Sequence, residues 1–226
     1  VLFADTFNRY FEPDNLSAAI EVLTAAGFKV HQPVAADGEA RPLCCGRTYL
    51  STGMVDKARA EANRTIKAFK PYLQKKIPIL GLEPSCLFTF KDEFLSLIDD
   101  DVAPVLAKSA MLLEEFLAGD GLQGFSRLKF QRTQGRVAWV HGHCHQKAFN
   151  SMDAVEQMLQ RVPDLTTKMI PSGCCGMAGA FGYQSETYDA SIGMAQLDLV
   201  PALAAVDHDD WLLADRFSCR HQISDV

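Results

Sequence analysis

The residues of this chain with the clearest capacity for chemistry are its cysteines, four of which lie in two copies of the triplet Cys-Cys-Gly. One copy begins at Cys44 and the other at Cys174. The chain has seven cysteines, an odd number that does not fit the disulfide framework of a small secreted domain. Free thiols in a reducing compartment, or cysteines that bind a metal, fit this number better.

In the second half of the chain, the cysteines follow three predicted strands, in the stretches VAWVHGHC, TKMIPSGCC and WLLADRFSC. Because parallel strands bring their C-terminal ends to one crevice, we expect these thiols to meet there. Four soft thiolates select zinc or an iron–sulfur cluster, and their negative charges require a cation or cluster in one pocket. The predicted ligands are Cys144, Cys174, Cys175 and Cys219.

The glycine of the second triplet, Gly176, has a role in this prediction. Adjacent side chains point different ways in a regular element, so two neighbouring thiols reach one centre only from an irregular backbone. Glycine permits such a backbone and lets it approach a bulky cluster closely, so we count Gly176 among the cofactor-binding residues.

The first half of the chain holds a less complete set of candidates. Asn8 stands where Cys144 stands in the second half, so one ligand is missing. Glu83, at the start of the stretch EPSC, is a further candidate as a carboxylate ligand, although a residue at a helix start before Pro84 explains it at least as well. We therefore expect a weaker, altered or empty site. Its candidate ligands are Cys44, Cys45, Cys86 and Glu83.

Three histidines lie around Cys144 in the stretch HGHCHQK. Imidazoles beside a cluster can donate hydrogen bonds to sulfur, relay protons or bind zinc. We assign a ligand or supporting role to His143 and His145. The alternative is that they cap the strand end and reach solvent.

The elements that must position these residues follow one plan twice. Each half has a strand, a helix, a strand, Cys-Cys-Gly, a helix, a strand and a last cysteine. Alternating helices and apolar strands indicate parallel sheets covered by helices, and the repetition indicates an internal duplication. We predict an α/β fold of two pseudo-symmetric lobes, each a small, mainly parallel sheet flanked by helices, with cysteines at the C-terminal ends of strands. The predicted lobes are residues 1–131 and 132–226.

Apolar runs and helical spacing give the predicted bounds of these elements. A proline at 201 predicts a break in the last long helix, which covers residues 185–206. A further helix is predicted at residues 109–117. The predicted strands are residues 1–5, 28–33 and 77–82 in the first half, and 136–142, 165–171 and 210–215 in the second.

Composition excludes several classes of function. The net charge is −6 and no run of Lys or Arg is present, so nucleic acid is not an expected partner. No apolar run reaches the roughly 18 residues needed to span a bilayer. The first segment has no basic stretch typical of a signal peptide, and the start without Met favours a fragment of a longer protein.

The arrangement Cys…CCG…xxC, present twice, resembles the cysteine-rich CCG domain family, which occurs in heterodisulfide reductase and in the iron–sulfur subunit of glycolate oxidase. The stretches VHGHCHQKA, PSGCCGMAGAFGY and FSCRHQI are most similar to the C-terminal part of FAD-linked oxidase/iron–sulfur fusion proteins that act on D-lactate or D-2-hydroxyglutarate. The resemblance implies a 4Fe–4S cluster at each complete motif, with zinc in some members. The CxxC that often ends the family's motif is EPSC and RFSC here, which argues against a five-cysteine cluster.

The resemblance further implies an electron-transfer domain of a flavin-linked 2-hydroxy-acid oxidoreductase. Electrons would pass from FAD, in a separate domain or a partner protein, towards an electron carrier or an acceptor at a membrane. The implied location is cytoplasmic or peripheral at the inner face of the membrane. No FAD or NAD fingerprint is visible, so no catalytic residue is assigned. Two alternatives stay open: a zinc-holding or metal-free docking module of the same enzyme, and a thiol–disulfide reducing site at Cys174 and Cys175.

Overall fold

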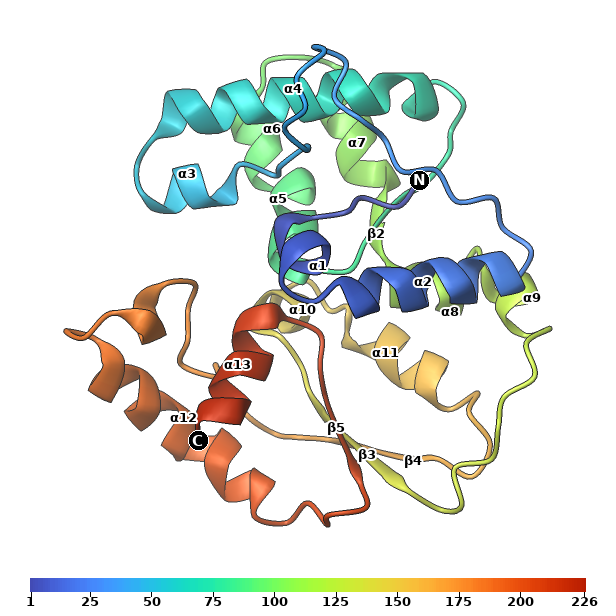
Figure 1. The fold of residues 1–226 in the computed structure, drawn as a ribbon, viewed down its shortest axis with the longest axis vertical. Coiled ribbons are helices and arrows are strands. Elements are labelled where there is room, and N and C mark those ends of the chain that lie inside the picture. The colour runs from blue at the N-terminus through green and yellow to red at the C-terminus, as the bar shows by residue number, and fades with distance from the viewer. The chain divides into compact units, whose positions relative to one another are not determined.

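The computed structural model describes all 226 residues and divides into two compact units, Val1–Leu128 and Lys129–Val226. Each unit contains a small parallel sheet flanked by helices (Figure 1). The predicted α/β class with two lobes is therefore confirmed. None of the helices combines the length and apolar character needed to cross a membrane.

The first unit contains a two-stranded parallel sheet, with β1 (Ile79–Gly81) beside β2 (Ala110–Leu112). The N-terminal segment joins it through a single bridge between Leu2 and Leu80. The helices of this unit are α1 (Thr6–Tyr10), α2 (Pro13–Ala25), α3 (Arg47–Ser51), α4 (Val55–Leu73), α5 (Pro84–Lys91), α6 (Glu93–Leu97), α7 (Val102–Ser109), α8 (Leu113–Ala118) and α9 (Leu122–Phe125).

Three predicted elements of the first unit are wrong. Residues 1–5 form only the isolated bridge at Leu2 and not a strand. Residues 28–33 do not form a strand, although the carbonyl of His31 accepts a hydrogen bond from the Leu2 N–H at 2.8 Å. The segment ends at Pro33, which has no N–H to extend a ladder. The helix predicted from residue 109 begins only at Leu113, because the short apolar run before it is strand β2.

A cluster of phenylalanines forms the core of the first unit. The ring of Phe3 meets Phe69 of α4 and Phe90 of α5 edge-to-face, with centroids 5.9 and 5.0 Å apart. Phe69 and Phe90 meet in the same way at 5.7 Å. Edge-to-face contact is a favourable arrangement of aromatic rings, so this cluster fixes α5, the helix that carries Cys86, against α4.

The second unit contains a three-stranded parallel sheet in the order β4–β3–β5. Its strands lie within the predicted ranges. The predicted helix break at Pro201 is wrong: α12 continues through it to end soon afterwards, at Leu203, where a missing N–H costs less than in mid-helix. The elements are β3 (Val137–His141), α10 (Cys144–Ala148), α11 (Met152–Leu159), β4 (Thr166–Met169), a 3₁₀ turn η1 (Phe181–Tyr183), α12 (Tyr188–Leu203), β5 (Trp211–Ala214) and α13 (Phe217–Asp225).

One carboxylate links the strands of this sheet at the end opposite the cysteines. Asp210, just before β5, accepts the Val137 N–H at 2.9 Å and the indole N–H of Trp139 at 3.0 Å. These hydrogen bonds, the backbone one first, lower the pKa of Asp210 below its ordinary value. A carboxyl whose pKa is lower in the folded state stabilises the fold above its unfolded pKa and loses this effect as the pH falls through its folded pKa.

Asp210→Asn is therefore expected to lower the melting temperature at pH 7, and the difference from wild type should shrink as the pH falls below about 4. Circular dichroism melts across that range measure it. Asp209→Asn is the matched control, because the Asp209 side chain is 93% exposed. A difference from wild type that is independent of pH, or equal in the two variants, would contradict this role for Asp210.

Candidate metal centre

The second unit brings all four of its cysteines to one edge of its sheet. Cys144 begins α10 directly after β3, and Cys219 lies in the first turn of α13 after β5. Cys174 and Cys175 lie in the loop that follows β4. The three strands are parallel, so their C-terminal ends share this edge.

The four thiols form a continuous chain of contacts. Cys174 is within hydrogen-bonding reach of Cys144 on one side and of Cys175 on the other. Cys175 reaches Cys219 in turn. Cys175 and Cys219 are buried, Cys174 is half-buried and Cys144 is exposed. The group thus has an inner end within the protein and an outer end at solvent.

Apolar side chains surround the inner end. Cys175 and Cys219 belong to a buried cluster that also contains Ile170, Met177 and Leu199. Such a shell keeps water away from the two sulfurs and lowers the local dielectric, which raises the cost of an uncompensated negative charge there.

Hydrogen bonds among the thiols divide them into two kinds. Bonds from Cys144 and Cys175 hold the pKa of Cys174 far below its ordinary value. Hydrogen bonds with Cys175 and, to a smaller extent, with His141 lower the pKa of Cys219 to about 6, although burial alone would raise it. The hydrogen bond of Cys144 to Cys174 and its partial burial raise the pKa of Cys144. Four thiols in mutual contact, two of them with lowered pKa values, are a soft donor set that a metal can bind by displacing the remaining protons.

Gly176 has the backbone that the two adjacent thiols require. Its φ is +93°, in the region that disfavours residues with a Cβ, and its N–H donates to the Cys174 sulfur at 3.4 Å. A Cβ at this position would lie 2.1 Å from the carbonyl oxygen of Ser191 in α12. The loop therefore has room for glycine alone.

The histidines on either side of Cys144 have different surroundings. His143 is buried, and its Nε2 lies 2.6 Å from the Arg216 guanidinium and 3.5 Å from the Cys144 sulfur. The ring of His145 lies edge-on to His143 with centroids 5.4 Å apart. Both rings thus lie beside the cysteines, and their roles toward a cofactor stay predictions.

A third histidine was missed as a site residue by sequence reasoning. His141 is buried at the end of β3, and its ligand nitrogen lies within 4.8 Å of the sulfurs of Cys175 and Cys219. The signal available in the sequence was its position as the last residue of a strand that leads to a cysteine. That position aims it at the same crevice.

The first unit assembles a smaller group. Cys45 is within hydrogen-bonding reach of both Cys44 and Cys86. A hydrogen bond with Cys45 lowers the pKa of Cys86, but burial and the nearby carboxyls of Asp5 and Glu83 outweigh it and raise this pKa to about 11. Nearby acidic groups disfavour a thiolate, so this group is less suited to a metal than the group in the second unit.

Asn8 and the remaining first-unit candidate, Glu83, both have structural partners. Asn8, in the place of Cys144, lies in α1 and donates its side-chain amide to Asp5 at 2.7 Å. Glu83 is the residue that precedes α5, is buried, and accepts a hydrogen bond from Ser85 Oγ at 2.6 Å. Both side chains thus support the starts of helices.

The sequence pattern of the CCG cysteine-rich domain matches the chain twice, at residues 6–91 and 138–224. The chain belongs to this family. Each match lies within one of the two units and includes its Cys-Cys-Gly triplet. The resemblance inferred from the cysteine pattern is thereby confirmed.

Relatives of this CCG protein include three proteins with informative names. One component of the anaerobic glycerol-3-phosphate dehydrogenase of Escherichia coli K12 is 25% identical over 98% of the chain and 53% of that protein. D-2-hydroxyglutarate dehydrogenase of Pantoea ananatis is 23% identical over 98% of the chain and 20% of that protein. Lactate utilization protein A of Macrococcus caseolyticus is 24% identical over 96% of the chain and 84% of that protein. The chain thus spans about half or less of the two dehydrogenase sequences.

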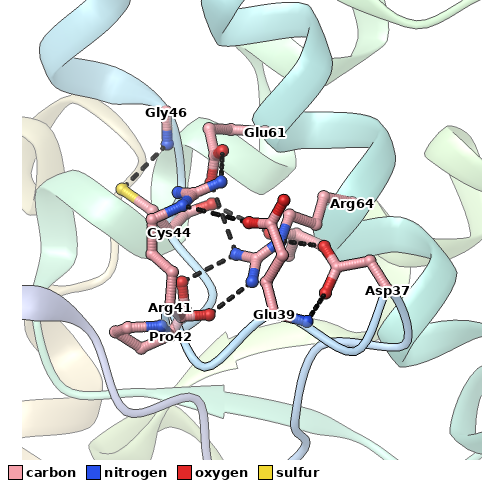
Figure 2. A network of polar contacts seen from close by, with 9 residues as sticks. Asp37, Glu39, Arg41, Pro42, Cys44, Gly46, Glu61 and Arg64 are labelled. Carbon is pink, nitrogen blue, oxygen red and sulfur yellow. Dashed lines mark hydrogen bonds and ion pairs between the residues drawn. The ribbon is translucent and has the colours of Figure 1, made fainter.

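A network of charged side chains holds the loop that carries the first Cys-Cys-Gly triplet of this CCG protein against α4 (Figure 2). Arg64 of α4 is almost fully buried, donates to the Pro42 carbonyl at 2.7 Å and to the Arg41 carbonyl, and pairs with Asp37 at 2.5 Å. Arg41 in turn pairs with the buried Glu61 at 2.5 Å. The loop before Cys44 is therefore fixed mainly by Arg64.

Arg64→Ala is expected to destabilise the protein by about 1–3 kcal/mol, because it removes a nearly buried guanidinium that donates to two loop carbonyls and pairs with Asp37. Arg59→Ala, on the same helix, is the control: its pairing partner Asp56 is 98% exposed, and such pairs contribute about 0–1 kcal/mol. Urea unfolding measures both. Equal losses for the two variants would show that the network does not hold this loop.

Proposed function

We propose that the second unit holds an iron–sulfur cluster of 4Fe–4S type and that the protein is an electron-transfer domain of a flavin-linked 2-hydroxy-acid oxidoreductase. The observation that carries this proposal is the meeting of four sulfurs at one sheet edge. Relatives named as dehydrogenases support a redox role. The proposed ligands are Cys144, Cys174, Cys175 and Cys219, with Gly176, His143 and His145 around them.

When bound, such a cluster takes up and releases single electrons. The chain's own residues supply the surroundings for this step. Cys175 and Cys219 hold the inner side within apolar packing, whereas exposed Cys144 brings the outer side to the surface, where a partner can approach. The Arg216 guanidinium beside His143 offers a fixed positive charge near the sulfurs, which favours the more negative, reduced state.

The partner that we propose is a flavin domain or flavin subunit of the same enzyme, which fits the relatives named as dehydrogenases of hydroxylated substrates. The acceptor that we propose is an electron carrier or a component at the inner face of a membrane, with the protein in the cytoplasm. The first-unit group of Cys44, Cys45, Cys86 and Glu83 is proposed as a weaker or empty site, since Asn8 supplies no thiolate.

Iron, acid-labile sulfide and zinc analysis, with electron paramagnetic resonance (EPR) spectroscopy of the dithionite-reduced protein, tests this function on anaerobically prepared material. We expect about four iron and four sulfide per chain and an EPR signal on reduction. Stoichiometric zinc without iron would overturn electron transfer and favour the docking role. The absence of any bound metal after reconstitution with ferrous iron and sulfide would overturn both.

A further inference from the structure

His141 has the position and the fixed orientation of a metal ligand. Its side chain is 1% exposed at the end of β3, and its Nδ1 lies 2.7 Å from the Oγ of Ser172, which follows β4. Its ligand nitrogen and the sulfurs of Cys175 and Cys219 all lie within 4.8 Å of one another. With bonds of about 2.0 Å to nitrogen and 2.3 Å to sulfur, the donors around one ion are roughly 3.5–4 Å apart, so this group needs little adjustment to bind one.

Ser172 gives the imidazole its orientation. A histidine that binds a metal through one ring nitrogen usually hydrogen bonds through the other, which fixes the ring and selects the tautomer. Ser172 is itself buried and provides that second contact from a neighbouring strand end. The nitrogen opposite Ser172 is then the one directed at the sulfurs of the inner end.

The first unit shows that the fold does not require a histidine here. Asp5 precedes Asn8 by the same interval by which His141 precedes Cys144. Asp5 caps helix α1: its Oδ1 accepts two backbone N–H groups, and its Oδ2 accepts the Asn8 amide. In the second unit, by contrast, the residue at the helix cap is His143, which leaves His141 free of that structural task.

We infer that His141 binds the metal of the second unit through Nε2, beside Cys175 and Cys219, and that Ser172 is the positioning residue for its ring. The inference rests on the proposed metal centre. The donor set then consists of the four thiolates and one imidazole, so one metal atom at the inner end carries both a cysteine and His141. His143, whose Nε2 contacts Arg216 at 2.6 Å, is not the coordinating imidazole.

The test uses the protein reconstituted with ferrous iron and sulfide and labelled with ¹⁵N-histidine, in the reduced state. Hyperfine (HYSCORE) spectroscopy is expected to show a strongly coupled histidine nitrogen in wild type. His141→Cys should bind the same amount of metal through an added thiolate and lose that coupling completely. His143→Asn and the exposed-site control His208→Asn should retain it. Ser172→Ala should keep the metal but change the coupling, because the ring is no longer held.

Three outcomes would overturn the inference alone: a loaded wild-type centre without a coupled histidine nitrogen, a coupling that persists in His141→Cys, or a coupling lost in a His143→Asn variant that still holds its full complement of metal. If wild type takes up zinc instead of iron, cobalt(II) replaces zinc as the paramagnetic probe, and the same three outcomes apply. A wild-type protein that binds neither iron nor zinc would overturn the proposed metal centre itself and, with it, this assignment.

Discussion

Cys175→Ser is expected to abolish metal binding, whereas Cys45→Ser should change the iron content far less. Cys175 lies within hydrogen-bonding reach of both Cys174 and Cys219. Its removal therefore separates Cys219 from the other two cysteines. The loss of a group that merely supports a metal ligand typically costs about 10–100-fold in affinity, and removal of a central ligand should cost more. Iron and sulfide per chain, with the visible charge-transfer absorption of the reconstituted protein, measure the effect.

Cys45 is a matched control because its environment is so similar. It follows the first thiol of the other Cys-Cys-Gly triplet, contacts Cys44 and Cys86, and is 4% exposed against 3% for Cys175. The two substitutions therefore place a similar polar hydroxyl in a similar buried position. Equal losses of iron in both variants, or full iron content in Cys175→Ser, would contradict the assignment of the centre to the second unit.

Gly176→Ala is expected to cost the second unit about 3–5 kcal/mol of stability, together with its metal. A Cβ at this left-handed position adds about 1–2 kcal/mol of backbone strain. It would also meet the Ser191 carbonyl oxygen at 2.1 Å, so α12 must shift. That oxygen accepts a hydrogen bond from the Gln222 amide, which connects α12 to α13 and so to Cys219. A loss of this size is a large part of the stability of a small domain.

Two other glycines separate the steric cost from the strain. Gly179 has φ +73° with open space around its Cβ position, so Gly179→Ala adds strain alone. Gly46, in the first triplet, has φ +78° and a Cβ position 3.2 Å from the Ala58 carbonyl oxygen, an intermediate case. Urea unfolding of the reduced, metal-free proteins should rank the losses as Gly176, then Gly46, then Gly179. Equal losses of unfolding stability in Gly176→Ala and Gly179→Ala would show that contact with α12 does not determine the conformation of the loop.

The meeting of the four second-unit cysteines followed from sequence because two simple rules sufficed. Apolar runs identified β3, β4 and β5, and parallel topology places the residues after all three at one edge. The strand predicted at residues 28–33 failed because its apolar pattern said nothing about a pairing partner. The short apolar run of β2 was assigned to a helix, since three residues show no periodicity that separates the two states.

The coordinating histidine could be chosen only from contacts between residues that are far apart in sequence. His141 and His143 both lie near the strand end and have the same burial. Their difference comes from Ser172, which holds one ring, and from Arg216, which contacts the other. Neither partner is a neighbour in sequence, so local pattern could not assign the coordinating imidazole to His141.

An anomalous difference map at the iron edge, from crystals of anaerobically reconstituted protein, tests the metal centre most directly. We predict one strong iron site in the second unit, enclosed by the sulfurs of Cys144, Cys174, Cys175 and Cys219, and no comparable site beside Cys45. Iron density elsewhere, or a separation of Cys144 or Cys219 from the 174–175 pair beyond the reach of one cluster, would contradict it.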